Sequence, residues 1–231
     1  MVDVYKDRRS VQEGLVNLYL RLNGYFITGF IIHSAVYGRN LAEIDALAVR
    51  LPYNQEPERE VGPSPFLEIT EGVTDLLICE VKSRGQALQF NEGFRESELA
   101  IAAVLRWAGL FREEEILPIA RELKEGLTPR TVAPRNLVIV EGPRGVRLRA
   151  LLCCPERWEK DRSQPPFLYG KETFSYVWTC LRPEVPRKAC GIRYDFTAWG
   201  SQLEPLVRYF KDREWEEGHG DMNSLYEDVG L

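Results

Sequence analysis

The sequence predicts an α/β domain in which helices flank a mixed central sheet. Three observations lead to this prediction: a helical apolar stripe near the N-terminus, two β-rich segments around a turn at residues 38–40, and a buried apolar strand at 74–84 followed by an amphipathic helix at 96–111. Because no Ser/Gly-rich or Pro-rich linker divides the 231 residues, we expect a single domain over residues 1–213. Its core is expected at about 8–155, with a C-terminal elaboration beyond it.

The N-terminal half gives the clearer signals. Residues 7–22 predict a helix with Ser10 as a candidate N-cap and the pair Asn23-Gly24 as its stop. Segments 24–34 and 41–51 are rich in β-branched and aromatic residues and read as a hairpin. The polar segment 52–71 is longer than most connections, so it is either a mobile flap or a variable insertion.

The second half is less distinct. Residues 172–181 fit a helix or a strand equally well. The other expected elements are a short helix at 113–123, strands at 136–140, 146–154 and 192–199, and a last helix at 202–211. Residues 214–231 hold six acids and no Lys or Arg, which suggests a mobile acidic tail.

Composition excludes several classes of protein. No run approaches the roughly 20 apolar residues that span a bilayer, and the N-terminus lacks a signal-peptide pattern, so we expect a cytoplasmic protein without a membrane partner. The five cysteines form no Cys-x-x-Cys pair and signal neither a zinc site nor a disulfide framework. Without the acidic tail the chain is close to neutral, so its net charge of −5 does not argue against a polyanionic partner.

Two charged residues interrupt the apolar strand at 74–84. Glu80 and Lys82 are two positions apart, so their side chains share one face of the sheet. Placing a carboxylate and an ammonium there costs more free energy than placing apolar residues. Either they form a structural ion pair, or the carboxylate holds a metal ion and the lysine acts beside it.

Further acids can join this pair. Asp45 lies on the strand at 41–51, with Glu43 on the same face, and Glu13 lies on the first helix. If the two strands pair, Asp45 and Glu80 can converge on one cation, and carboxylate oxygens suit Mg²⁺ or Mn²⁺. If such a cation activates a water that attacks a phosphate group, Lys82 would stabilise that water and the developing negative charge on the phosphoryl oxygens. Glu13 either is an ordinary solvated residue or points toward this site.

The motifs that carry these residues resemble those of the PD-(D/E)XK nuclease superfamily, which has a restriction-endonuclease-like αβββαβ core. The similarity covers about residues 8–110 and is greatest to nucleases of the Holliday-junction-resolvase and restriction type. The matching pieces are Glu13, the step Gly24-Tyr25, the stretch Ala-Glu-Ile-Asp-Ala-Leu-Ala at 42–48, and Ile-Cys-Glu-Val-Lys-Ser-Arg at 78–84. The resemblance implies Mg²⁺-dependent hydrolysis of phosphodiester bonds in DNA, with Asp45 and Glu80 as metal ligands, Lys82 as the catalytic lysine and Glu13 as an auxiliary acid.

The sequence departs from that pattern in two places. Ile44 stands where the motif name has a proline, and the long loop before Glu80 makes Asp75 or Glu71 an alternative metal ligand. Auxiliary candidates are Glu43, Gln86 and Gln89, and the candidates for contact with nucleic-acid phosphates are Arg84, Arg147 and Arg149.

Two non-enzymatic readings stay open. One is a non-catalytic binding or regulatory module on the same fold, associated with a defence system or a mobile element. The other is an assembly protein whose acidic tail docks on a basic partner or screens its own DNA groove. A homodimer or a protein partner is compatible with either reading.

Overall fold

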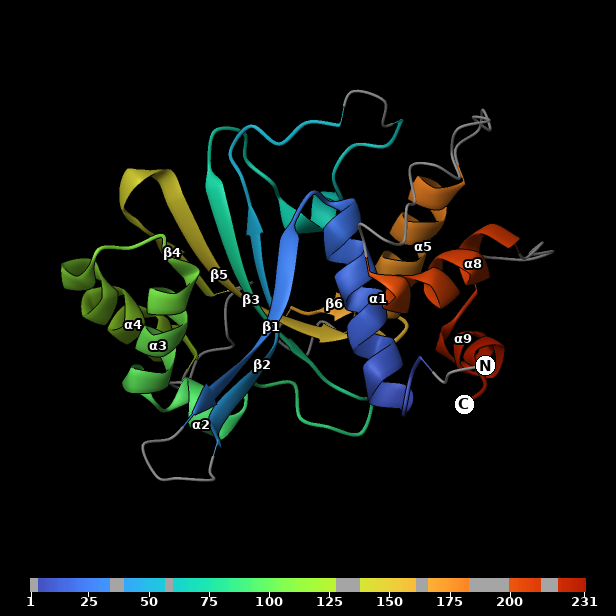
Figure 1. The fold of residues 1–231 in the computed structure, drawn as a ribbon, viewed down its shortest axis with the longest axis horizontal. Coiled ribbons are helices and arrows are strands. Elements are labelled where there is room, and N and C mark those ends of the chain that lie inside the picture. The colour runs from blue at the N-terminus through green and yellow to red at the C-terminus, as the bar shows by residue number, and fades with distance from the viewer. Residues whose placement is uncertain are drawn as a thin grey trace.

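The computed structural model describes residues 4–33, 40–56, 60–127, 138–160, 166–182, 200–212 and 220–231. It is a mixed α/β fold, and the predicted fold class is confirmed: one sheet contains the described strands in the order β1-β2-β3-β5-β4, with β6 beside β5 (Figure 1). The elements in chain order are α1 Arg8–Leu22, β1 Phe26–His33, β2 Asn40–Arg50, η1 Pro65–Leu67, β3 Thr74–Val81, α2 Glu92–Arg95, α3 Glu98–Ala108, α4 Glu113–Leu127, β4 Val138–Glu141, η2 Pro143–Gly145, β5 Val146–Cys154, β6 Leu168–Tyr169, α5 Gly170–Leu181, η3 Ser201–Leu203, α8 Glu204–Asp212 and α9 Met222–Val229.

The strand pairing combines a hairpin with a parallel crossover. β1 and β2 form the predicted antiparallel hairpin, and β2 pairs antiparallel with β3. β3 and β5 are parallel, with Val81 opposite Cys153, so both strands end at the same edge of the sheet. β6 continues this edge beside β5. The carboxyl ends of three parallel strands therefore lie together, and the Glu-x-Lys motif follows one of them.

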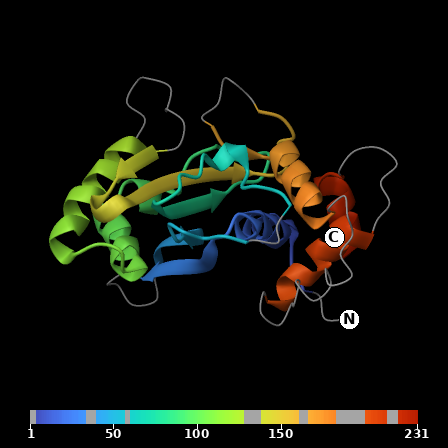
Figure 2. The same cartoon turned by 90° about the horizontal axis from the view of Figure 1, so that it is seen from above.

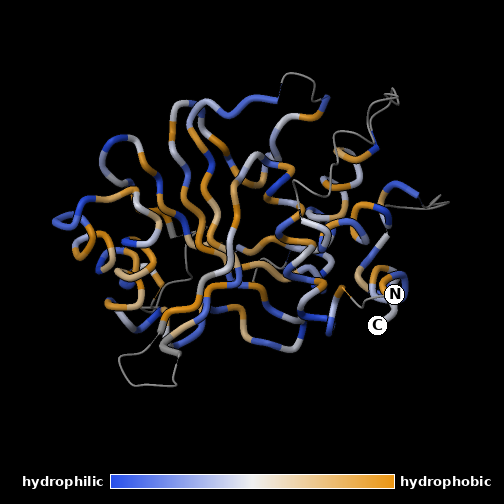
Figure 3. Tube along the Cα trace, viewed as in Figure 1, coloured by the Kyte–Doolittle hydropathy of each residue, from blue (hydrophilic) through white to orange (hydrophobic). Residues whose placement is uncertain are grey.

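Helices cover both faces of the sheet. α1, α5, α8 and α9 pack on one face, and α2, α3 and α4 pack on the other (Figures 1 and 2). Along β3 the side chains alternate between these two layers, and positions 75 to 81 are all buried. Hydrophobic residues accordingly gather along the central strands (Figure 3). The sheet has a core on each side, and charged side chains within β3 have little access to water.

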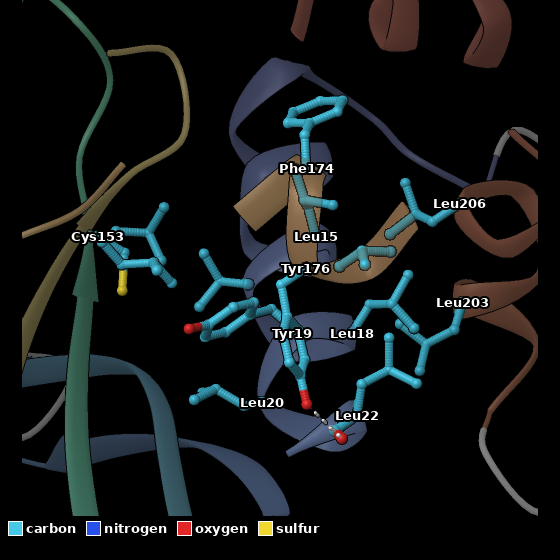
Figure 4. Packing of buried hydrophobic residues seen from close by; sticks show 14 of the residues in the cluster. Leu15, Leu18, Tyr19, Leu20, Leu22, Cys153, Phe174, Tyr176, Leu203 and Leu206 are labelled. Carbon is cyan, nitrogen blue, oxygen red and sulfur yellow. Dashed lines mark hydrogen bonds between the residues drawn. The ribbon is translucent and has the colours of Figure 1, made fainter. Parts of the chain in front are cut away.

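α1 is the central helix of one layer. Asp7 caps it and accepts a hydrogen bond from the Ser10 amide at 2.8 Å, so Ser10 is the third residue of a capping box rather than the cap we expected. The helix ends as predicted, at Asn23 followed by Gly24 with φ +83°. Its apolar stripe packs against side chains of α5 and α8, and the Tyr176 hydroxyl donates to the Leu22 carbonyl at 3.3 Å (Figure 4).

The expected mobile acidic tail is wrong for its last residues. Met222 to Val229 form helix α9, with Met222, Leu225 and Tyr226 buried in the α1-side core. These three residues lie on one helical face, so their burial outweighs the repulsion among the acids around them. Residues 214–219 lie outside the described part of the chain.

The structure decides between the alternatives for residues 172–181 and for part of the loop at 52–71. Residues 170–181 form a helix, which decides between the alternatives for 172–181. The segment 60–73 is fastened to the sheet, because Ser64 and Leu67 are buried, so the flap interpretation is wrong for this part of the loop. The strand expected at 192–199 lies outside the described residues, and no described helix is long and apolar enough to cross a membrane.

Candidate functional site

A β-bulge places Asp45 at the point where β2 leaves β3. Thr28 pairs with Leu47 and Phe30 with Ile44, so Asp45 and Ala46 together lie opposite Gly29. A bulge bends its strand and changes the direction of one side chain. Here it leaves Ala46 in the α1-side core and lets the Asp45 side chain point toward α1.

Both carboxylate oxygens of Asp45 have a partner. The pairing of β2 with β3 ends at Ala46 and Cys79. Beyond it, Asp45 Oδ2 accepts a hydrogen bond from the Val81 amide at 2.7 Å, and Asp45 Oδ1 accepts one from Arg9 Nη2 at 2.7 Å. The side chain of Asp45 is only 2% exposed. The carboxylate thus closes the strand pair and, at the same time, holds a cation from α1.

Arg9 links two of the predicted acids. Its Nε atom donates to Glu13 Oε1 at 2.7 Å, one helical turn along α1. Glu13 therefore points toward the strand end rather than into solvent, and its burial raises its pKa, with a further contribution from the charge of Asp45. Half of the Arg9 side chain stays exposed.

Glu80 and Lys82 form the second half of the site. As predicted, they share a face, and Lys82 Nζ donates to Glu80 Oε1 at 2.7 Å. Lys82 Nζ also donates to Asn91 Oδ1 at 2.9 Å, and Asn91 is the N-cap residue of α2. Asn91 makes no side-chain capping bond, so its amide oxygen is committed to the lysine. Lys82 is thereby held between a strand and a helix.

The Glu80 carboxylate is costly to ionise where it lies. Burial raises its pKa to about 7, and the negative charge of Asp45 contributes to the same shift, while Lys82 opposes it. Its second oxygen, Oε2, is buried and has no hydrogen-bond partner among the described residues. An ionised oxygen in such a position has an unfilled need for a cation or a donor.

The two carboxylates reach the strand end from different layers. The alternation along β3 places Glu80 on the side of Leu76 and Ile78, which pack against α2–α4, whereas Asp45 faces α1. The two carboxylates therefore do not share a face as we expected, although the negative charge of Asp45 contributes to the raised pKa of Glu80. No group of three or more His, Cys, Asp or Glu side chains in the described part of the chain is arranged to hold a metal ion.

The chemistry of the donors nevertheless suits a hard divalent cation. Mg²⁺ keeps several of its water ligands and commonly binds through one or two carboxylates. The unpartnered Glu80 Oε2 and the Asp45 carboxylate supply two oxygens of that kind, with Glu13 beside Asp45. For such an ion to bind, Asp45 Oδ1 has to exchange its bond to Arg9.

The alternative metal ligand Asp75 belongs to a different cluster. Arg149 donates to both oxygens of Asp75, the Tyr25 hydroxyl donates to Oδ2 at 2.6 Å, and Arg147 lies 3.3 Å from the same oxygen. This cluster is buried at the opposite end of β3 from Glu80, near exposed Glu71. Asp75 and Glu71 are thus too far along the strand to replace Asp45.

Arg147 and Arg149 were candidates for phosphate contact, and this prediction is wrong. Both are buried, Arg149 at 1% exposure. Their guanidinium groups also donate to the carbonyls of Leu67 and Glu68, at 2.5 and 3.2 Å, which fastens the long loop to the sheet. Two arginines on one strand face indicate a solvated basic patch only when that face is open.

The remaining candidates lie at the edge of the site. Glu43 is exposed, and its negative charge contributes to the raised pKa of Glu13. Gln86 accepts from the Ser83 amide at 2.8 Å and closes the turn after the strand, whereas Gln89 accepts from Arg95 at 2.7 Å. Arg84 is exposed beside the motif, where its amide donates to Glu156.

Arg9 and Asn91 are the two residues of the site that the sequence did not reveal. Arg9 stands four residues before Glu13 on a helix, a spacing that permits an ion pair, but its contact with Asp45 depends on how α1 packs on the sheet. Asn91 carried only the signal of a helix cap, and its contact with Lys82 is set by the turn at 83–90.

No family model, no curated protein and no solved structure matches the chain.

Proposed function

We propose that the protein is a divalent-metal-dependent nuclease that hydrolyses phosphodiester bonds in DNA. The observation that carries this proposal is the group at the shared edge of β2 and β3: a buried glutamate with one unpartnered oxygen, a lysine held beside it and a second buried carboxylate on the neighbouring strand. The fold, in which one helix precedes three antiparallel strands and β5 pairs in parallel with the third of them, supports the same function. We include the predicted cytoplasmic location in this proposal.

In this proposal the residues of the chain divide the work. Glu80 Oε2 and Asp45 would hold Mg²⁺ or Mn²⁺, which supplies charge neutralisation at the phosphoryl oxygen and a more acidic water. Lys82, fixed by Glu80 and Asn91, directs its ammonium at the reacting phosphate. Water attacks phosphorus in line, the bond to the leaving oxygen breaks, and a phosphate monoester and a hydroxyl group form.

The basic residues for DNA would come from the same edge of the sheet. Exposed Arg84 follows the motif directly, and Arg157 Nη2 donates to the carbonyl of Gln86 at 3.3 Å. Farther along this edge, Lys160 and Lys171 line a hollow of about 300 Å³ together with Glu159 and Tyr169. These side chains replace Arg147 and Arg149 as our candidates for phosphate contact.

A cleavage assay on duplex, single-stranded and branched DNA with Mg²⁺ or Mn²⁺ tests the function. We expect cutting by the parent, and a loss of at least about a hundredfold in Glu80→Gln and Lys82→Met. Asp45→Asn keeps an acceptor for the Val81 amide, so it should fold and still lose activity. Glu114→Gln, on the exposed face of α4, is the matched control. Equal cutting by parent and variants would refute the assignment.

One observation favours the non-catalytic module instead. Asp45 already has a partner on each oxygen, and Arg9 supplies the positive charge that a metal would bring. In that case the acids and bases form a structural ion network, and the edge with Arg84 serves binding alone. DNA binding by the parent without cleavage in any metal would support this second function.

A further inference from the structure

Arg9 stands at the position where the proposed function needs a divalent cation. Its guanidinium group contacts Asp45 Oδ1 and Glu13 Oε1, each at 2.7 Å, and its charge also acts on the pKa of Glu80. One side chain thus bridges the acids that α1 and β2 contribute, while Glu80 of β3 pairs with Lys82.

A further cation can bind at this site only if it replaces one that is already there. Glu13, Asp45 and Glu80 are paired with two positively charged side chains, Arg9 and Lys82. A divalent ion added to all of these would leave the group positively charged in a partly buried place, which is unfavourable. One of the two resident cations therefore has to move when a metal ion binds.

Burial decides which cation moves. The Lys82 side chain is 10% exposed and is held from two sides by Glu80 and Asn91. The Arg9 side chain is 50% exposed and lies in the first turn of α1, where it can turn outward without breaking the helix or its cap. Arg9 is the residue that can leave.

We infer that Arg9 is an exchangeable counter-ion of the site: it holds the Asp45 carboxylate in place until a divalent cation takes it over. This inference rests on the proposed function. It assigns to Arg9 a competition with the metal ion for Asp45, while Glu13 keeps its ion pair with Arg9 or faces solvent.

Titration of the DNA-free protein with Mn²⁺ and Mg²⁺, followed by calorimetry, tests the exchange. Because Arg9→Gln removes charged hydrogen bonds to both acids, we expect it to bind either metal at least about tenfold more tightly than the parent. Arg8→Gln is the matched control: it removes the same charge from the neighbouring residue, whose guanidinium group lies over the Tyr226 ring. It should bind metal like the parent.

Thermal unfolding supplies a second measurement. In EDTA, Arg9→Gln should melt below Arg8→Gln, because Asp45 then lacks a counter-ion, and Mg²⁺ should remove this difference by supplying the missing positive charge. Arg9→Lys keeps the charge but reaches only one acid, so its melting temperature and its metal affinity should lie between those of the parent and Arg9→Gln. It serves as the second variant if Arg9→Gln folds poorly.

The outcomes separate the two proposals. Metal binding by the parent with equal or weaker binding by Arg9→Gln overturns the exchange and leaves the proposed metal site standing. An absence of metal binding in the parent and in Arg9→Gln overturns both.

Discussion

The chemistry of single residues is dominated by where water is excluded. Glu80, Lys82 and Arg149 are all charged residues inside a sheet that has a core on each face, but they are compensated to different degrees. Arg149 finds a carboxylate, a hydroxyl and a carbonyl, whereas one Glu80 oxygen has no partner. An unfilled requirement marks a site for chemistry more reliably than a buried charge alone.

The raised pKa of Glu80 predicts how stability depends on pH in metal-free buffer. The folded protein binds the proton of the Glu80 carboxyl more tightly than the unfolded chain does. The stabilisation from this proton is complete below about pH 4.5 and is lost as pH rises through about 7. Over that range Glu80 should cost the parent on the order of 3 kcal/mol of unfolding free energy. Urea titrations at several pH values should show this slope in the parent and in Glu114→Gln, but not in Glu80→Gln. An identical slope in Glu80→Gln would exclude the shift.

The buried arginine cluster predicts a loss of stability without a loss of function. Arg149→Met leaves Asp75 buried beside Tyr25 with less positive charge, so the unfolding free energy should fall by about 3–5 kcal/mol. Arg208→Met, which breaks an exposed ion pair with Glu204, should leave the unfolding free energy nearly unchanged. Denaturant titration measures both. If Arg149→Met folds normally and only DNA binding weakens, the structural role is wrong.

Residue identity alone carried part of this site. The shared face of Glu80 and Lys82 was predictable, because two-residue periodicity fixes which side chains lie together on a strand. The direction of the Asp45 side chain was not, because the bulge interrupts that period. The sequence could not show that Arg147 and Arg149 are buried, since this depends on a loop from 60 to 73 that covers their face. A pattern of charges gives the face but not what packs against it.

At the scale of elements, the turns and ends of strands position the site. The bulge at Asp45 is signalled in the sequence only by Gly29 inside the partner strand, and such a glycine is compatible with several irregularities. Helix and strand periods predicted α1, β1–β3, α3 and β5 well, because these elements repeat apolar residues over many positions. Bulges and caps depend on one or two residues and are harder to foresee.

Two helix caps predict opposite effects of the same substitution. Ser97 caps α3 through a 3.1 Å bond from the Ala100 amide, so Ser97→Ala should cost about 1 kcal/mol of stability and leave cleavage intact. Asn91 instead accepts from Lys82, so, if the protein is the nuclease we propose, Asn91→Ala should lower kcat about tenfold with KM nearly unchanged. Chemical denaturation and steady-state cleavage of DNA separate the two. A fall in stability without a change in kcat for Asn91→Ala would make it an ordinary cap.

At the scale of the whole molecule, the C-terminal helix braces the edge of the site. The Tyr226 hydroxyl donates to Glu156 Oε1 at 2.8 Å, and Glu156 Oε2 accepts from the Arg84 amide at 2.7 Å. Arg8, next to Arg9, lies over the ring of Tyr226 at 4.8 Å. The acids at 214–231 suggested a tail separate from the domain. Met222, Leu225 and Tyr226 of α9 nevertheless pack in the core that α1 and α8 form, and this packing depends on contacts that are distant in the sequence.

This arrangement predicts that the apolar anchors of α9, and not its acids, determine what the C-terminus contributes. Leu225 is fully buried, so Leu225→Ala should lower the unfolding free energy by about 2–5 kcal/mol. Tyr226→Phe removes the hydroxyl that donates to Glu156 and also contacts Gln12, so it should loosen the turn after Lys82, which hydrogen exchange at the Arg84 amide would detect. Glu227→Gln, which neutralises an exposed acid, should leave stability and DNA affinity unchanged. Tighter DNA binding by Glu227→Gln, with normal stability in Leu225→Ala, would instead favour an acidic segment that screens a DNA groove, because charge rather than packing would then link the C-terminus to the site.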